Sequence, residues 1–155
     1  VSSAFASSSA FSTFFGAAFF TAFLAAGLAS SFFAFTGSVT NSMMTIKAEK
    51  AVRQLQKEGI SAELIDLRTI VPLDTETIIR AVKKTGKLLI VDEGHLSFGI
   101  TGEIASRIMP DVFYDLDAPI QRMGTADVPL PFSPALEFPL IPDEKKIAAK
   151  IREMV

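Results

Sequence analysis

The chain has 155 residues, of which 49% are hydrophobic, with 15 Lys and Arg against 17 Asp and Glu. A formal net charge of −2 provides no basic surface for a nucleic-acid backbone, so we expect no nucleic-acid partner. The absence of cysteine excludes disulfides, thiol catalysis and zinc sites built on cysteine, and the single histidine argues against a transition-metal site with several ligands.

The first part of the chain differs in composition from the rest. Residues 1–42 contain ten Phe, ten Ala and ten Ser, whereas every charged residue lies at or beyond Lys47. The uncharged stretch 10–35 has 26 residues, enough for a helix to cross a hydrocarbon core of roughly 30 Å at about 1.5 Å per residue. It is nevertheless poor in Leu, Ile and Val, and no Trp, Tyr, Lys or Arg marks a membrane interface before it. Residues 1–38 are therefore predicted to be either foreign sequence or a membrane helix, and residues 39–155 to form the globular domain.

Beyond residue 42, segments with the apolar spacing of helices alternate with short apolar strands. Strands that alternate with helices predict a mainly parallel sheet with helices on both of its faces. Helices are expected over residues 45–58, 75–85, 99–109 and after Asp143, and strands over residues 60–68, 88–91 and 118–123.

Capping residues and prolines predict where several of these elements end. Asp74 and Asp143 are expected to cap the helices that follow them, and Gly86 and Pro110 to end the helices that precede them. Five of the eight prolines lie in residues 129–142, which excludes a regular helix or a central strand there.

The best candidate functional position follows the unbroken apolar run of residues 88–91. Ligands of open α/β sheets bind in crevices at the carboxyl ends of strands, and the next residues are Asp92, Glu93, Gly94 and His95. Glu93 and His95 could act there as an acid and a base. The alternative, which we favour, is a strand-to-helix turn that needs polar residues and a glycine.

Two further groups of residues have a functional and a structural interpretation. Gly94, Gly99 and Gly102 suggest a phosphate cradle, but their spacing matches no phosphate-binding motif, and tight turns or close packing explain them better. Asp66 and Arg68 lie on a predicted strand and are interpreted as an ion pair at its end in preference to a ligand site.

The loop of residues 124–142 is apolar as well as rich in proline. An extended loop of this composition packs either against its own domain or against a neighbouring chain, so we consider it a candidate subunit contact. Its large apolar residues are Val128, Leu130, Phe132, Leu136, Phe138, Leu140 and Ile141.

Five strings in order and spacing resemble the C-terminal domain of the β subunits of thiamine-diphosphate-dependent 2-oxo acid dehydrogenases. They are KEGISAELIDLRTIVPLDTETI, KTGKLLIVDEG, FGITGEIASRI, LDAPIQRMGTADVPLPFSPALE and IPDEKKIAAKI. The resemblance covers residues 39–155, and pyruvate dehydrogenase is the nearest group. The combination of D-L-R-T-x-x-P-L-D with D-A-P and D-V-P-x-P is specific to this family, whereas no single one of these motifs would be.

The resemblance implies a three-layer α/β/α sandwich on a mostly parallel, five-stranded sheet, as in transketolase C-terminal domains. It implies a heterotetramer with an α subunit and a second β subunit, which decarboxylates a 2-oxo acid oxidatively and passes the acyl group to the lipoyl arm of a dihydrolipoyl acyltransferase component. The full complex uses thiamine diphosphate and Mg²⁺. In this family the α subunit and an upstream β-subunit domain supply the catalytic, cofactor and metal residues. No such residue is therefore assigned here, and the chain alone is expected to bind no cofactor and to be inactive.

Partner contacts are the role that the resemblance assigns to this domain. The expected partner-facing positions are Arg152, Glu153 and the Val155 carboxylate, together with Asp127, Pro129 and Phe132 in the loop. A solvated helix end is the alternative for the three terminal positions.

The resemblance also requires a central strand before the first helix. Residues 39–42 match its end, and the partly alternating apolar residues 33–38 could serve as a substitute strand. Without this central strand, the two neighbouring strands would lose their backbone hydrogen-bond partners. Each buried group left unpaired would cost about 1–3 kcal/mol of folding free energy.

Two rival functions remain open on the sequence. One is a membrane-tethered α/β ligand-binding module anchored by residues 10–35, and the other is a transketolase or deoxyxylulose synthase-type fragment, which the D-V-P-x-P loop disfavours. The expected location is the bacterial cytoplasm if residues 1–38 are foreign and the membrane otherwise, and the mitochondrial matrix stays open.

Overall fold

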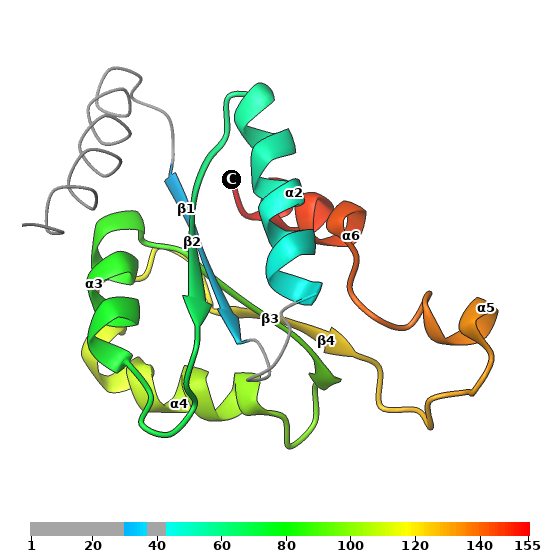
Figure 1. Ribbon diagram of the computed structural model, residues 1–155. Coiled ribbons are helices and arrows are strands. Elements are labelled where there is room, and N and C mark those ends of the chain that lie inside the picture. The colour runs from blue at the N-terminus through cyan, green and yellow to red at the C-terminus, as the bar shows by residue number, and fades with distance from the viewer. Residues whose placement is uncertain (1–29, 37–42) are drawn as a thin grey trace, which may run out of the picture.

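Four parallel strands form one sheet in the computed structural model, which describes residues 30–36 and 43–155. The strand order is β2-β1-β3-β4, and all three neighbouring pairs run parallel (Figure 1). The strands are β1 (Ser30–Thr36), β2 (Ser61–Leu67), β3 (Leu88–His95) and β4 (Gln121–Thr125).

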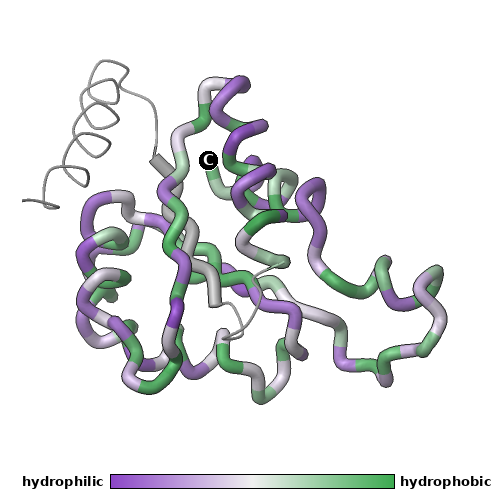
Figure 2. The backbone as a smooth tube through the Cα atoms, in the orientation of Figure 1, coloured by the Kyte–Doolittle hydropathy of each residue, from purple (hydrophilic) through white to green (hydrophobic). Residues whose placement is uncertain are grey.

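Two helices cover each face of the sheet, which confirms the predicted three-layer α/β/α sandwich (Figure 1). One layer contains α2 (Met43–Lys57) and α6 (Glu144–Met154), and the other contains α3 (Thr75–Thr85) and α4 (Ile100–Val112). Figure 2 shows hydrophobic and hydrophilic residues alternating along these helices, as expected of helices with one buried face.

The two halves of the core meet at β3. Leu88 and Ile90 pack with α3 and α4, whereas Leu89 and Val91 pack with α2 and α6. All four side chains are fully buried, because successive residues of a strand point to opposite faces and both faces are covered. The unbroken apolar run of the sequence therefore correctly predicted a doubly covered strand.

The central position of the sheet, between β2 and β3, is filled by β1. The substitute strand predicted over residues 33–38 is present, but it begins at Ser30 and ends at Thr36. The predicted contribution of residues 39–42 lies outside the described residues, as does most of the candidate membrane segment 10–35. Within the described residues the sheet has four strands where the resemblance implied five.

Local end signals were predicted correctly for two helices. The Asp74 side chain accepts hydrogen bonds from the backbone N–H and the hydroxyl of Thr77, and these bonds hold the pKa of Asp74 below its ordinary value. Gly86 ends α3 with a left-handed φ of 70°, a conformation in which glycine carries no steric penalty. Asp143 caps α6 by accepting from the backbone N–H of Lys146.

The predicted end of α4 was wrong, because the helix continues through Pro110 to Val112. The proline removes one backbone N–H donor, but Val112 is fully buried and extends the stripe of Ile104 and Ile108 by one more turn. Burial of this side chain outweighs the lost hydrogen bond.

Two other boundaries also differ from expectation. The loop rich in proline contains a short helix, α5 (Pro134–Glu137), because proline is tolerated at the first position of a helix. Strand β4 starts at Gln121 instead of residue 118, since Asp117 bonds through its N–H to the Gly86 carbonyl and Pro119 has no N–H for the ladder. In the part of the chain that the structure describes, no helix combines the length and apolarity needed to span a membrane.

The packing of α4 against the sheet generates a stability prediction. Ile104→Ala removes a fully buried side chain, and we expect a loss of about 2–5 kcal/mol in the free energy of unfolding. Ile46→Ala on α2 is the matched control, because Ile46 is 48% exposed, and its expected change is within about 0.5 kcal/mol. Urea denaturation followed by circular dichroism measures both, and equal losses would contradict the assigned core.

Candidate functional site

The described residues place the candidate site at the carboxyl ends of β3 and β4. The segment 92–95 was predicted as a turn, but it forms the second half of β3. Val91 pairs with Met123, and His95 pairs with Thr125. Four residue steps along β3 therefore lie opposite two residue steps along β4, which marks a bulge in β3. Such bulges bend a strand and redirect its side chains at the rim of a sheet.

Glu93 and His95, the predicted acid and base, are both exposed at this rim. The Thr125 hydroxyl donates to the carbonyl oxygen of Glu93 (2.6 Å), and Nδ1 of His95 lies 2.9 Å from the Ala126 carbonyl oxygen. Each contact joins a side chain to a main-chain carbonyl oxygen and so connects β3 to the end of β4. They show a structural role for this segment and leave the Glu93 carboxylate facing solvent.

A second contact joins the loop after β3 to the residues after β4. Asp127 accepts from the backbone N–H of Ser97 (3.1 Å) and from the Ser97 hydroxyl (2.5 Å). The hydroxyl bond, followed by the backbone bond, lowers the pKa of Asp127 below its ordinary value. We call this pair of hydrogen bonds the Asp127–Ser97 clasp.

Close packing accounts for the central glycine of the proposed phosphate cradle. A Cβ atom on Gly99 would lie 2.0 Å from the His95 carbonyl oxygen. This distance is too short for any residue with a side chain, so the position requires glycine. Gly102 lies within α4 beside the Arg122 guanidinium, and Gly94 lies within β3. The structure favours the packing interpretation of these residues.

The strand-end charges Asp66 and Arg68 are engaged with neighbours, as the ion-pair interpretation predicted. Asp66 accepts from the Thr45 hydroxyl (3.1 Å), and its carboxylate lies 3.7 Å from Nε of Arg68. The described residues contain no group of three or more His, Asp or Glu side chains arranged to hold a metal ion.

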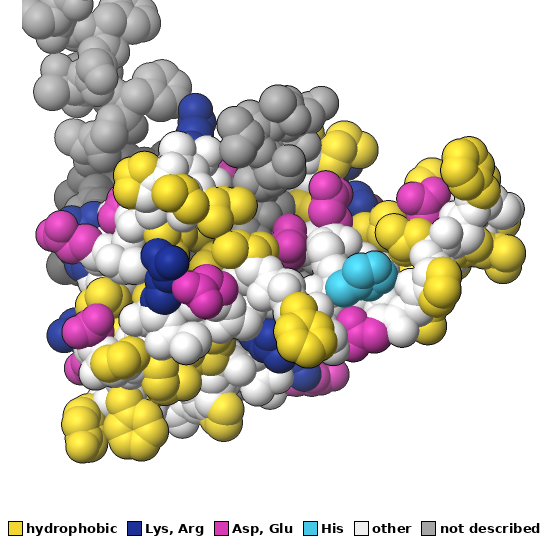
Figure 3. Space-filling model, turned by 90° about the horizontal axis from the view of Figure 1, so that it is seen from below, with side chains coloured by type: hydrophobic (Ala, Val, Ile, Leu, Met, Phe, Trp, Pro, Cys, Tyr) yellow, Lys and Arg dark blue, Asp and Glu magenta, His cyan; other side chains and the backbone are white. Residues whose placement is uncertain are grey.

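Residues 126–142, which we call the arm, project from the body of the domain and include α5 (Figure 1). Figure 3 shows hydrophobic side chains along this projection. Five of its large apolar residues are exposed to solvent, and Phe132 is fully exposed at 105%. The five are Val128, Leu130, Phe132, Leu136 and Phe138.

The base of the arm is fixed to the domain although its tip is exposed. Pro142 is buried, and its carbonyl oxygen accepts from Nζ of Lys47 (3.3 Å). Lys146 donates to the carbonyl oxygens of Pro139 and Ile141. With the Asp127–Ser97 clasp at its other end, the arm is held at both of its connections.

The three predicted terminal positions lie at the far end of α6 from the arm. Arg152 forms a two-pronged ion pair with Glu58 on the turn after α2 (2.7 and 2.8 Å), which lowers the pKa of Glu58. Glu153 pairs with Lys150 at 2.9 Å, and Nζ of Lys87 lies 3.5 Å from the Val155 carbonyl oxygen. Because α6 has 11 residues, about 16 Å separates these positions from the arm. The six predicted partner-facing residues therefore form two separate groups.

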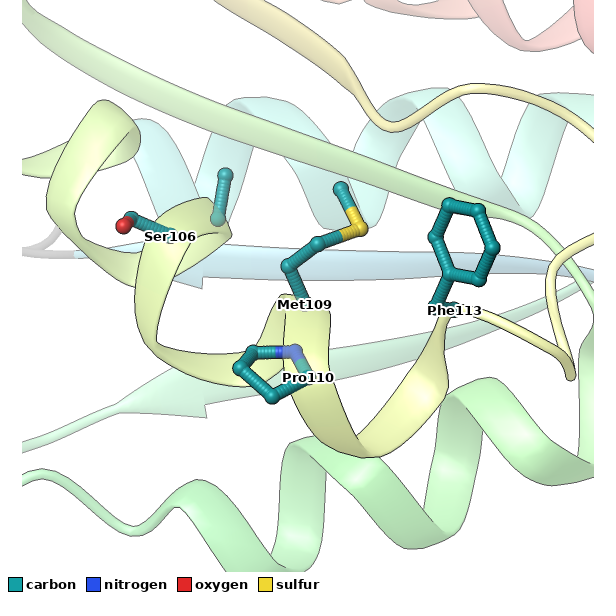
Figure 4. A pocket seen from close by; sticks show the side chains of 5 residues that line it. Ser106, Met109, Pro110 and Phe113 are labelled. Atoms are coloured by element: carbon teal, nitrogen blue, oxygen red, sulfur yellow. The ribbon is translucent and has the colours of Figure 1, made fainter.

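An apolar hollow on the outer side of α4 was missed by the sequence reasoning. It has a volume of about 410 Å³ and is lined by Ala105, Ser106, Met109, Pro110 and Phe113, four of which Figure 4 labels. Phe113 and Tyr114 stack edge to face beside it, with ring centroids 5.2 Å apart. The sequence could have indicated this hollow through Met109 and Phe113, because these apolar residues lie outside the buried stripe of Ile104 and Ile108.

The clasp predicts a specific pKa change. Ser97→Ala removes the hydroxyl that contributes most to the lowered pKa of Asp127, so this pKa should rise toward its ordinary value. A carboxyl NMR titration measures it, and Ser106→Ala on α4 is the control that should leave it unchanged. Because folding lowers this pKa, the clasp stabilises the fold above about pH 4 and is lost as the pH falls through the folded pKa. An Asp127 pKa that is the same in wild type and Ser97→Ala would contradict the clasp.

Comparisons with known proteins agree with this geometry. The family "Transketolase, C-terminal domain" matches residues 39–147. The chain is 45% identical over 116 residues to the pyruvate dehydrogenase E1 component subunit beta of Rickettsia felis, covering 75% of this chain and 36% of that protein. It is 40% identical to the 2-oxoisovalerate dehydrogenase subunit beta of Bacillus subtilis, with the same coverage of 75% and 36%. A mitochondrial pyruvate dehydrogenase E1 component subunit beta from Dictyostelium discoideum is 48% identical over 103 residues, which cover 66% of this chain and 27% of that protein.

A solved structure shows the same fold. It is a split gene transketolase in an inactive beta4 tetramer, with a TM-score of 0.62 and 22% identity over 81% of this chain and 38% of that chain. The chain spans about a third of the length of the pyruvate and 2-oxoisovalerate dehydrogenase subunits from Rickettsia and Bacillus. These matches confirm the resemblance found in the sequence strings. The chain belongs to the transketolase C-terminal domain family.

Proposed function

We propose that this chain acts as the C-terminal part of the β subunit of a pyruvate or related 2-oxo acid dehydrogenase, supplying subunit contacts and no catalytic group. The observation that carries the proposal is a sequence identity of 40–48% to such subunits over residues that fold as one domain. The membrane-module and transketolase alternatives are not favoured, because the curated relatives cited above are dehydrogenase β subunits and the transketolase likeness concerns fold at 22% identity.

Thiamine diphosphate and Mg²⁺ belong to the full complex in this proposal. Magnesium needs an octahedral set of oxygen ligands, usually including carboxylates. The described residues contain no group of three or more His, Asp or Glu side chains that could hold a metal ion. The proposal assigns no chemical step to this chain, and its contribution is structural.

The arm is the surface that we assign to contact with the α subunit or the second β subunit. Its exposed apolar side chains extend away from the domain, and aromatic residues of this kind dominate the energy of protein interfaces. Both ends of the arm are fixed, so little conformational entropy is lost when a partner binds. Asp127, Pro129 and Phe132 are the partner-facing residues on it.

The C-terminal end of α6 is the surface that we assign to the acyltransferase component. Arg152 and Glu153 are charged and exposed, and their ion pairs with Glu58 and Lys150 lie at the surface. Surface ion pairs contribute little to stability, so a partner's charged groups can replace them at small cost. Val155, which is also exposed, is the third partner-facing residue that we assign to this surface. The location follows that of the partner subunits, in the bacterial cytoplasm or the mitochondrial matrix.

Binding measurements with the α subunit and with a complete β subunit test the arm. Phe132→Ser should weaken association about tenfold or more, because it removes a large apolar contact. Phe113→Ser is the matched control, since Phe113 is also an exposed aromatic residue but directly follows α4, away from the arm, and the affinity of this variant should stay within about threefold of wild type. Equal affinities of Phe132→Ser and wild type for both partners would contradict the assignment of the arm.

An activity assay tests the absence of catalytic groups. The chain alone, with thiamine diphosphate, Mg²⁺ and pyruvate, should release no carbon dioxide above a protein-free control. The complete α and β subunits of a pyruvate dehydrogenase serve as the positive control. Thiamine-dependent turnover by the isolated chain would overturn the proposal.

A further inference from the structure

The strand in the middle of the sheet comes from a part of the chain that the family match does not include. Strand β1 ends at Thr36, whereas the family match begins at residue 39. Its sequence, SSFFAFT, belongs to the segment with the unusual composition of Phe, Ala and Ser. The central position of this sheet is therefore filled by residues outside the family match.

The position of β1 is defined by main-chain pairing on both sides. All seven of its residues are in register with β2, from Ser30 with Ser61 to Thr36 with Leu67. Residues 32–35 are also in register with β3, from Phe32 with Leu88 to Phe35 with Val91. Because strands lie about 4.8 Å apart, β2 and β3 are separated by roughly 9.6 Å, the width that one strand fills.

One helix lies over each face of the sheet at the position between β2 and β3. Both α2 and α3 contact β1, and they lie on opposite faces of the sheet. Charged side chains are almost never buried without a partner, and Ser30–Thr36 carries no charge. The space thus imposes two requirements on its occupant, an extended backbone and the absence of charge.

We propose that β2 and β3 form a strand-binding groove that recognises an uncharged extended segment mainly through its backbone, and that Ser30–Thr36 occupies it without needing its covalent link to α2. Recognition by strand addition depends on main-chain hydrogen bonds, with side chains adding selectivity. This explains how a segment outside the family match fills the groove. A free peptide of the same sequence is then also a ligand for it.

Cleavage of the full chain tests this proposal. A protease site is introduced within residues 37–42, the intact protein is purified, and the chain is then cut between β1 and α2. The N-terminal fragment should co-elute with the rest of the chain under native conditions and separate in denaturant. Release of the fragment on cutting, under native conditions, would overturn the proposal.

A peptide exchange experiment distinguishes binding through backbone hydrogen bonds from non-specific hydrophobic binding. A labelled peptide of residues 30–36 with a solubilising tail should displace the cut fragment. The same peptide with Ala34→Pro should bind at least about tenfold more weakly, because proline cannot donate to a ladder on either side. Ala34→Ser is the matched control that keeps the N–H and should bind like wild type. Equal binding of the proline and serine peptides would contradict recognition through the backbone.

Discussion

Main-chain pairing of β1 with both β2 and β3 is the constraint on which the rest of this structure depends. The backbone donors and acceptors of β2 and β3 point toward each other across a gap one strand wide. Strand β1 fills this gap and pairs with both neighbours. Strand β3 can then be buried on both faces, where Leu88 to Val91 divide their side chains between the two helical layers. The carboxyl ends of β3 and β4, and so the base of the arm, are positioned by this arrangement.

Rigid attachment and exposed apolar surface are combined in the arm. The Asp127–Ser97 clasp, the buried Pro142 and the Lys47 and Lys146 side chains fix its two connections, while residues such as Phe132 lie in solvent. A domain of this kind is suited to hold a preformed contact surface for other subunits. The rim residues Glu93 and His95 fit the same role, since their segment joins β3 to the start of the arm.

Features encoded by neighbouring residues were predictable, and those encoded by distant residues were not. The Asp74 and Asp143 caps and the Gly86 terminus follow from a few adjacent residues, and the buried run 88–91 follows from its own composition. Pro110 was misjudged because the burial of Val112, a tertiary effect, decides where α4 ends. The pairing of Asp127 with Ser97 joins residues 30 apart in sequence, and no local pattern indicates it.

Hydrogen exchange followed by mass spectrometry, on the full chain alone and mixed with the α subunit, tests the account most directly. Strands β1 and β3 should exchange slowly in both samples, because their amides are bonded within a covered sheet. Amides of the arm should exchange fast in the chain alone and slowly in the mixture. Exchange of Ser30–Thr36 as fast as that of the arm in the chain alone would contradict the account.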